Sequence, residues 1–396
     1  MKKAVLTACL IGMLTTVCFV SAARAEEPKA AGEEKAFVDM PKLDKKPLIQ
    51  MAILLDTSSS MSGLIDQART ELWAIVNEFI VAKRSGLRPE LWVALYEYGK
   101  SSLSQQEGYI RMIVPLTTDL DKISEELFAL KTNGGQEYCG WVIKDATEDL
   151  QWSNSPDDLK VIFIAGNEPF TQGKVDYRQA CKDAVSRGII INTIHCGSEK
   201  QGLDGKWKDG AELADGRYLN IDQNRQVVHI EAPQDSLIAE LGLKLNETYI
   251  PYGQIGDMAS ARQTTQDRNA ATASKEAEVQ RAVTKSSANY RNEAWDLVDA
   301  VQNDKLELEN VKDQELPEQM RRMTAQERKA YVETKAKERA RIQQNIQQLN
   351  EQRKKYVAQE MKTRQQGENT LGSAIIHAIR EQANKKNLTF EPGQTQ

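Results

Sequence analysis

The order of apolar and polar positions predicts strands that alternate with helices between residues 48 and 245. Five successive apolar residues, Met51 to Leu55, leave no polar side, which is typical of a strand covered on both faces in a parallel sheet. Apolar residues from Leu64 to Ile80 then recur at helical spacing and predict a helix that packs on this sheet. Further strands are expected at 91–96, 109–114, 161–165, 189–194 and 218–221, and further helices at 119–130, 141–150, 176–187 and 234–245. This alternation predicts an α/β fold with a doubly wound, mostly parallel sheet.

The pattern changes in residues 246–396, which are rich in Gln, Glu, Lys, Arg and Ala and predict a helical extension. Thr324 and Glu327 are spaced as a capping box for a long helix. In that helix an alternating spacing of four and three residues joins Ile342, Ile346, Leu349, Arg353 and Tyr356. Because a charged residue interrupts this spacing within about two heptads, a helical hairpin or a helix docked on the sheet is favoured, with at most part of the extension in a coiled coil.

The first 25 residues have the pattern of a bacterial signal peptide. Lys2 and Lys3 precede an apolar run, and Ala23-Arg24-Ala25 resembles a cleavage site. Residues 26–47, which are rich in Lys, Glu, Ala and Pro, predict a flexible tether. We therefore expect a periplasmic or secreted protein without a transmembrane helix in its mature form, although the apolar run could instead be retained as an anchor.

Charge is unevenly distributed along a chain whose net charge is −5. Residues 317–366 contain thirteen Lys or Arg, six Glu and no Asp. This excess of basic residues suits an anionic envelope surface, a solvated helix face, or docking on acidic residues of the same chain. Nucleic acid is not an expected partner for an exported protein.

A cluster of oxygen-bearing side chains follows the first predicted strand. Asp56, Ser58 and Ser60 supply one carboxylate and two hydroxyls at alternate positions, which are the hard ligands that Mg²⁺ or Mn²⁺ accepts. In a doubly wound sheet, ligands bind at the carboxyl ends of the strands, where these residues are expected. The alternative is a turn in which Asp and Ser cap the following helix without a metal.

The Asp-x-Ser-x-Ser pattern after a hydrophobic strand resembles the metal-ion-dependent adhesion site of von Willebrand factor A domains, of a bacterial exported type. In that family a threonine and an aspartate from later loops complete the site, and an acidic residue of a partner protein joins the metal. Here Gln136 and the pair Gly166-Asn167 stand at the corresponding positions. We hypothesise that two nearby glutamates restore the missing charge, so the predicted metal ligands are Asp56, Ser58, Ser60, Glu137 and Glu168.

The resemblance implies a binding or adaptor protein, not an enzyme, that engages an acidic residue of an unidentified protein partner. One alternative is a structural envelope protein that acts through the basic residues 317–366. Another is a hydrolase that uses a metal-activated water or the thiol of Cys196 beside His195. Neighbours on a strand point to opposite faces, which argues against that thiol pair. Cys139, Cys181 and Cys196 remain after signal cleavage, and one unassigned disulfide plus a free thiol is the simplest oxidised state.

Overall fold

The computed structural model describes residues 46–222, 224, 229–364 and 370–390. The predicted signal peptide, residues 1–25, and nearly all of the predicted tether, residues 26–47, lie outside the described residues. Within the described part, no helix is both long enough and apolar enough to cross a membrane.

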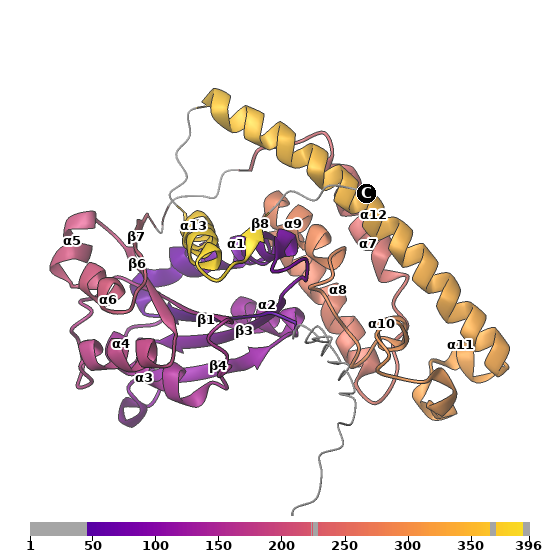
Figure 1. Ribbon diagram of the computed structural model, residues 1–396, viewed down its shortest axis with the longest axis horizontal. Coiled ribbons are helices and arrows are strands. Elements are labelled where there is room, and N and C mark those ends of the chain that lie inside the picture. Colours follow the sequence, from indigo (N-terminus) through magenta and orange to yellow (C-terminus); the bar gives the residue numbers. More distant parts are fainter. Residues whose placement is uncertain (1–45, 223, 225–228, 365–369, 391–396) are drawn as a thin grey trace, which may run out of the picture. The chain divides into compact units, whose positions relative to one another are not determined.

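A six-stranded sheet forms the centre of the first part of the chain (Figure 1). Its strands are β1 (Leu48–Asp56), β3 (Glu90–Tyr98), β4 (Ile110–Thr117), β5 (Leu159–Gly166), β6 (Ile190–Cys196) and β7 (Tyr218–Ile221). They lie in the order β4-β3-β1-β5-β6-β7, and all neighbours are parallel except the antiparallel pair β3 and β4. The predicted α/β fold with a mostly parallel sheet is confirmed.

Helices cover both faces of this sheet, because alternate residues of β1 enter two separate cores. Ile49, Met51 and Ile53 pack in one core with α1 (Ser62–Glu78) and α2 (Leu120–Ala129). Ala52 and Leu54 pack in the other. The second core also contains α3 (Cys139–Asp149), α4 (Tyr177–Ser186) and α6 (Trp207–Leu213). The short helices α5 (Glu199–Asp204) and α6 lie in a stretch where the sequence analysis predicted no element.

The last described segment of the chain packs on the sheet beside α1. Helix α13 (Leu371–Asn384) places Ile375 and Ile379 in the same core as β1, and β8 (Thr389–Phe390) pairs with β2 (Ala82–Lys83). Glu71 of α1 accepts the backbone N–H of Gly372 at 2.6 Å, so it caps the amino terminus of α13. The core of the sheet therefore includes residues far beyond the domain boundary predicted at residues 245 and 246.

The remaining helices pack on one another. They are α7 (Asp235–Asn246), α8 (Gly256–Ala273), α9 (Lys275–Lys285), α10 (Leu297–Gln302), α11 (Glu318–Arg321) and α12 (Ala325–Arg364). Of these, α8 and α9 also pack on α1 and α2. Short 3₁₀ turns lie in the sheet part at Ser59–Met61, Phe79–Val81 and Gln105–Glu107, and between α10 and α11 at Leu308–Asn310 and Asp313–Glu315. Ile342 and Ile346 of α12 share a core with residues of α7 and α9. The expected capping box is present, since the backbone N–H of Thr324 donates to Glu327 at 2.7 Å.

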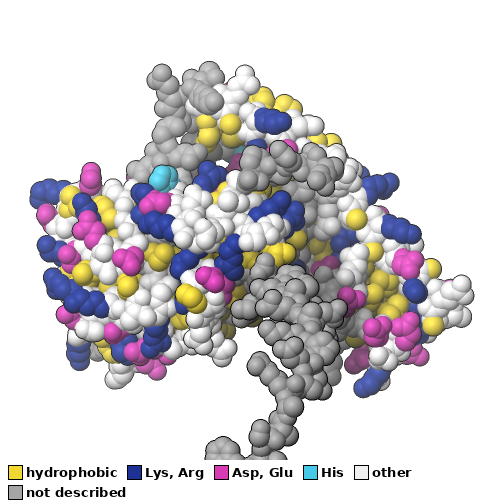
Figure 2. Space-filling model, in the orientation of Figure 1, with side chains coloured by type: hydrophobic (Ala, Val, Ile, Leu, Met, Phe, Trp, Pro, Cys, Tyr) yellow, Lys and Arg dark blue, Asp and Glu magenta, His cyan; other side chains and the backbone are white. Residues whose placement is uncertain are grey.

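Arginines on the inner face of α12 form ion pairs within the chain. Arg353 lies 2.6 Å from both Asp235 and Glu276, and Arg339 lies 2.7 Å from Asp296. The sequence analysis expected the charge of Arg353 to interrupt the buried stripe of α12. Instead, Arg353 is part of that stripe, because acidic residues compensate its charge in the interior. Figure 2 shows Lys and Arg mixed with Asp and Glu over the visible face. Docking on acidic residues of the same chain accounts for part of the basic charge in residues 317–366.

The ion pairs of Arg353 adjoin a histidine, which predicts a pH dependence. Hydrogen bonding to Glu276 at 2.9 Å, opposed by burial and aided by the charges of Glu276 and Asp235, raises the pKa of His229. A raised pKa stabilises the fold below the unfolded pKa of about 6.5, and that contribution disappears as pH rises through the folded value. We expect His229→Gln to lower Tm at pH 5.5 and to have little effect at pH 9, as measured by circular dichroism. An equal loss of Tm at both values would contradict this assignment.

Candidate functional site

The candidate site lies where the order of strands reverses. From β1 the chain proceeds to β3 and β4 on one side and then to β5, β6 and β7 on the other, so the carboxyl ends of β1 and β5 flank the switch point. Crevices at such points are the usual ligand sites of doubly wound sheets. Asp56 ends β1, and Asn167 and Glu168 directly follow β5. The topology thus places the predicted residues at the expected edge.

The loop after β1 is held by its own hydrogen bonds. The backbone N–H of Thr57 donates to Tyr98 O at 2.8 Å, and the N–H of Ser58 donates to Asp56 Oδ1 at 2.7 Å. The hydroxyls of Ser58 and Ser60 lie 3.2 Å apart. Neither the 3₁₀ turn at Ser59–Met61 nor helix α1 receives a side-chain cap. The two serines therefore do not act as helix caps. Of the interactions expected for a capping turn without a metal, only the hydrogen bond from the Ser58 N–H to Asp56 Oδ1 is present.

Glu137 comes close to Asp56 from the loop before α3. A Cβ on Gly99 would lie 2.8 Å from both Asp56 Oδ1 and Glu137 Cγ, so only a glycine allows the two side chains to approach at this point. Gly99 also has a φ of +82°, which disfavours other residues. Asp56 is fully buried and Glu137 is 6% exposed. The carboxylate that the sequence analysis proposed as a replacement is thus brought beside Asp56.

Asn167 adds an oxygen that the sequence analysis did not count as a ligand. Its Nδ2 donates to Ser60 Oγ at 3.2 Å, while its Oδ1 is buried without a hydrogen-bond partner. Asp56 Oδ2 is likewise buried and unpaired. Glu168 acts on Asp56 through its charge, and its backbone carbonyl accepts Trp207 Nε1 at 2.8 Å. The position of Asn167, where the family has an aspartate, was the signal that could have identified this oxygen.

Burial and neighbouring carboxylates make Asp56 and Glu137 difficult to ionise. Burial, together with the charge of Glu168, raises the pKa of Asp56 to about 7, although the Ser58 amide opposes this rise. Burial and then the charges of Asp56 and Glu168 raise the pKa of Glu137 to about 7. Removing water from a carboxylate and adding a like charge both favour the neutral acid. A bound cation reverses this preference because it supplies the missing opposite charge.

The available oxygens fit a hard divalent cation. They are Asp56 Oδ2, the hydroxyls of Ser58 and Ser60, the carboxylate of Glu137 and the amide oxygen of Asn167. The remaining predicted ligand, Glu168, is half-buried and is linked to the site by the effect of its charge on the pKa values of Asp56 and Glu137. Within the described residues, no group of three or more His, Cys, Asp or Glu side chains is placed to hold a metal ion. A cation here would therefore rest on two carboxylates, neutral oxygens and water, which is a ligand set of the kind that Mg²⁺ accepts.

The thiols have the features of buried structural residues. Cys139, Cys181 and Cys196 are each buried and free of disulfides. Burial raises the pKa of Cys196, so its reactive thiolate form is disfavoured at neutral pH. Cys196 packs in the core that contains α1, whereas the ring of His195 lies 5.7 Å from that of Trp207 in α6. The two side chains point to opposite faces of β6, as the sequence analysis expected.

Comparison with known proteins gives fold-level similarities only. No protein-family model matches the chain, and no curated protein sequence matches it. Among solved structures, the chain is similar to the conserved hypothetical protein BatB from Bacteroides thetaiotaomicron, with 15% identity, a TM-score of 0.34, and coverage of 44% of this chain and 90% of that chain.

Two further solved structures have comparable similarity. The VWA domain of SpRpn10 is 17% identical with a TM-score of 0.34, covering 45% of this chain and 90% of that chain. An aerotolerance-related membrane protein from Bacteroides fragilis is 14% identical with a TM-score of 0.31, covering 44% of this chain and 93% of that chain. Each of these similarities extends over less than half of this chain.

Proposed function

We propose that the chain is an exported binding protein that holds a divalent cation at the carboxyl end of β1 and uses it to engage an acidic group of a protein partner. The observation that carries the proposal is the unpaired, fully buried Oδ2 of Asp56 beside the carboxyl of Glu137. A buried carboxylate oxygen without a partner is costly, and a cation offsets that cost while the carboxyl group stays ionised.

The surroundings of the site favour a partner that approaches from the loop side. Ser59, Ser60 and the loop residues Gly134, Gly135 and Gln136 are exposed, whereas Asp56 is covered by the protein. A cation among these oxygens retains open positions, because two carboxylates and a few neutral ligands do not fill the six positions that Mg²⁺ prefers. An acid from another protein is a suitable ligand for such a position.

Metal titration tests the first half of the proposal. Calorimetry should show that Mn²⁺ or Mg²⁺ binds the wild-type protein and that Asp56→Asn lowers the affinity at least about tenfold, because the substitution removes a charged ligand and keeps its shape. Ser59→Ala is the matched control, since Ser59 is exposed in the same loop and lies outside the ligand set. Equal affinities for the wild type and Asp56→Asn would exclude this site.

Capture experiments test the second half. A partner retained from an envelope extract with Mg²⁺ and released by a chelator supports recognition through the cation. Retention that resists the chelator but is lost at high salt supports the alternative, in which exposed basic residues such as Lys329, Lys337 and Arg341 bind an anionic surface. This alternative is favoured only by the excess of Lys and Arg in residues 317–366.

A further inference from the structure

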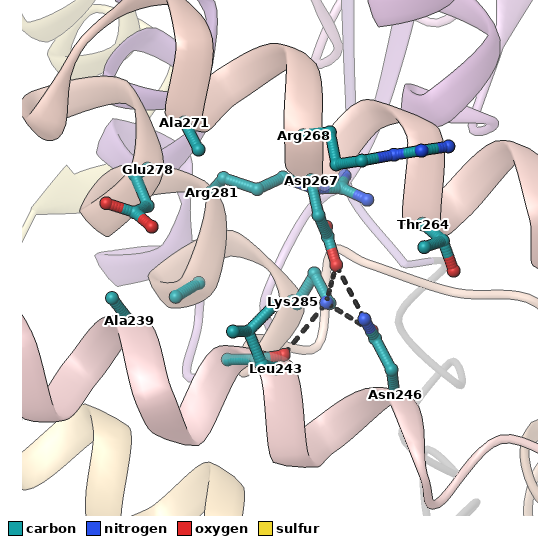
Figure 3. Close-up of a pocket in the computed structure, with 12 residues that line it drawn as sticks. Ala239, Leu243, Asn246, Thr264, Asp267, Arg268, Ala271, Glu278, Arg281 and Lys285 are labelled. Atoms are coloured by element: carbon teal, nitrogen blue, oxygen red, sulfur yellow. Dashed lines mark hydrogen bonds and ion pairs between the residues drawn. The ribbon is translucent and has the colours of Figure 1, made fainter.

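A second site lies in the helical part, in a pocket between α7, α8 and α9 (Figure 3). Its volume is about 260 Å³. None of its lining residues belongs to the loops around Asp56, so this pocket is separate from the proposed cation site. Pockets that hold drug-sized molecules have volumes of roughly 300 to 1,000 Å³, so this one suits a smaller ligand.

One end of the pocket is polar, but its buried charges are already satisfied. Lys285 Nζ lies 2.7 Å from Asp267 Oδ2 and donates to Gly242 O at 3.0 Å and to Asn246 Oδ1. Asp267 also lies 2.8 Å from Arg281 Nε. Figure 3 shows Asp267, Lys285 and Asn246 joined at this end. Because each of these groups has its partners, a ligand that placed another charge on this floor would break an existing pair.

Apart from Glu278, the other end of the pocket is apolar. Figure 3 shows Ala239 and Ala271 at this end, away from the Asp267 and Lys285 pair. Leu243, which also lines the pocket, is 60% exposed despite its size. Covering such a side chain with hydrocarbon is favourable by about 25 cal/mol per Å² of apolar surface. The walls therefore suit a flexible hydrocarbon chain.

The rim of the pocket has an excess of positive charge. Arg268 is exposed and lies toward the polar end beside Thr264. Its guanidinium donates to the hydroxyl of Thr265 at 3.2 Å and forms no ion pair among the described residues. Glu278, at the opposite end, is paired with Lys275 at 2.7 Å. The guanidinium of Arg268 therefore remains available for a carboxylate, which it can bind through two parallel hydrogen bonds.

We propose that this pocket binds a small amphipathic carboxylate, with the hydrocarbon chain between α7 and α8 and the carboxylate on Arg268. The volume suits a single unbranched chain of about eight carbon atoms. An amine of the same length is disfavoured because its charge would lie beside Arg268. An uncharged alcohol retains the apolar contacts and loses the ionic contact.

Octanoate is the probe that tests this site on the full chain. Titration calorimetry should show one saturable site, with octylamine and octanol each binding about two- to fivefold more weakly, as expected for loss of a solvent-exposed ion pair. Arg268→Gln should weaken octanoate binding by about the same factor. Lys244→Gln is the matched control, because it removes an exposed cation of α7 that does not line the pocket.

A second variant separates the pocket from nonspecific binding of a surfactant. Ala271 is exposed on α8, so Ala271→Phe can fill the apolar end without burying a new group in the core. This variant should abolish octanoate binding while the circular dichroism spectrum stays unchanged. Octanoate binding that survives Ala271→Phe, or that is equal for octanoate and octylamine, would overturn the proposal. Absence of octanoate binding to the wild type would overturn it as well.

Discussion

Ile375→Ala in α13 is expected to lower the free energy of unfolding by about 2 to 5 kcal/mol. Ile375 is fully buried in the core that contains β1, β5 and α1, so the shortened side chain leaves a cavity that the surrounding strands cannot fill. Urea unfolding followed by tryptophan fluorescence measures this change, and Trp73 of α1 lies in the same core. The effect is large because Ile375, although far from β1 in the sequence, packs in the core that surrounds this strand.

The neighbouring residue provides the control for this variant. Ile376 carries the same side chain on the same helix but is half-buried beside β7. Ile376→Ala should therefore cost less than half as much as Ile375→Ala, since exposed atoms lose little on truncation. Equal losses of unfolding free energy for the two variants would contradict the packing of Ile375 in the core with β1, β5 and α1.

Arg281→Met is expected to destabilise the protein by about 3 to 5 kcal/mol. Arg281 is 2% exposed and lies 2.5 Å from Asp121 Oδ1 in α2 and 2.8 Å from Asp267 Oδ1 in α8. Its guanidinium carbon also lies 4.4 Å from the ring of Trp73 in α1. Removing the guanidinium leaves the buried carboxylate of Asp121 without a counter-charge and leaves Asp267 paired with Lys285 alone, while methionine still fills most of the volume.

Two further variants show whether the loss comes from uncompensated charge. Lys275→Met, which breaks an exposed pair with Glu278, should change stability by less than about 1 kcal/mol. Adding Asp121→Asn to Arg281→Met should restore part of the loss, because the carboxylate that lost its counter-charge is then absent. Urea midpoints of the three variants decide the matter. No recovery in the double variant would assign the role of Arg281 to packing on Trp73 instead.

The sheet could be predicted from the sequence because the apolar pattern within each strand is sufficient to identify that strand. Runs such as Met51 to Leu55 have no polar side, and Asp119 precedes its helix as a cap whose side chain accepts the N–H of Lys122. The place of α13 could not be predicted in this way. An amphipathic helix at residues 371–384 does not specify which surface it covers, and its partners on α1 lie about three hundred residues away in the sequence.

The candidate site was predicted only in part, for a similar reason. Asp56, Ser58 and Ser60 lie within one loop, so their proximity follows directly from the local pattern. The approach of Glu137 depends on Gly99, whose missing side chain makes room between two loops, and that packing has no counterpart in the spacing of residues along the chain. The sequence position of Asn167 marks it as a candidate, but that its oxygen is unpaired becomes known only from its burial in the structure.

The docking of α13 on α1 also has a consequence for biosynthesis. Until residues 371–388 have been synthesised, the side of α1 that contacts α13 and part of β5 remain open to solvent. Contacts between residues so far apart in the sequence form late, and until then the folding intermediates expose apolar surface that is prone to aggregate. We expect nascent chains that stop before residue 370 to be retained by holdase chaperones and to be degraded, even though every strand of the sheet has by then been synthesised.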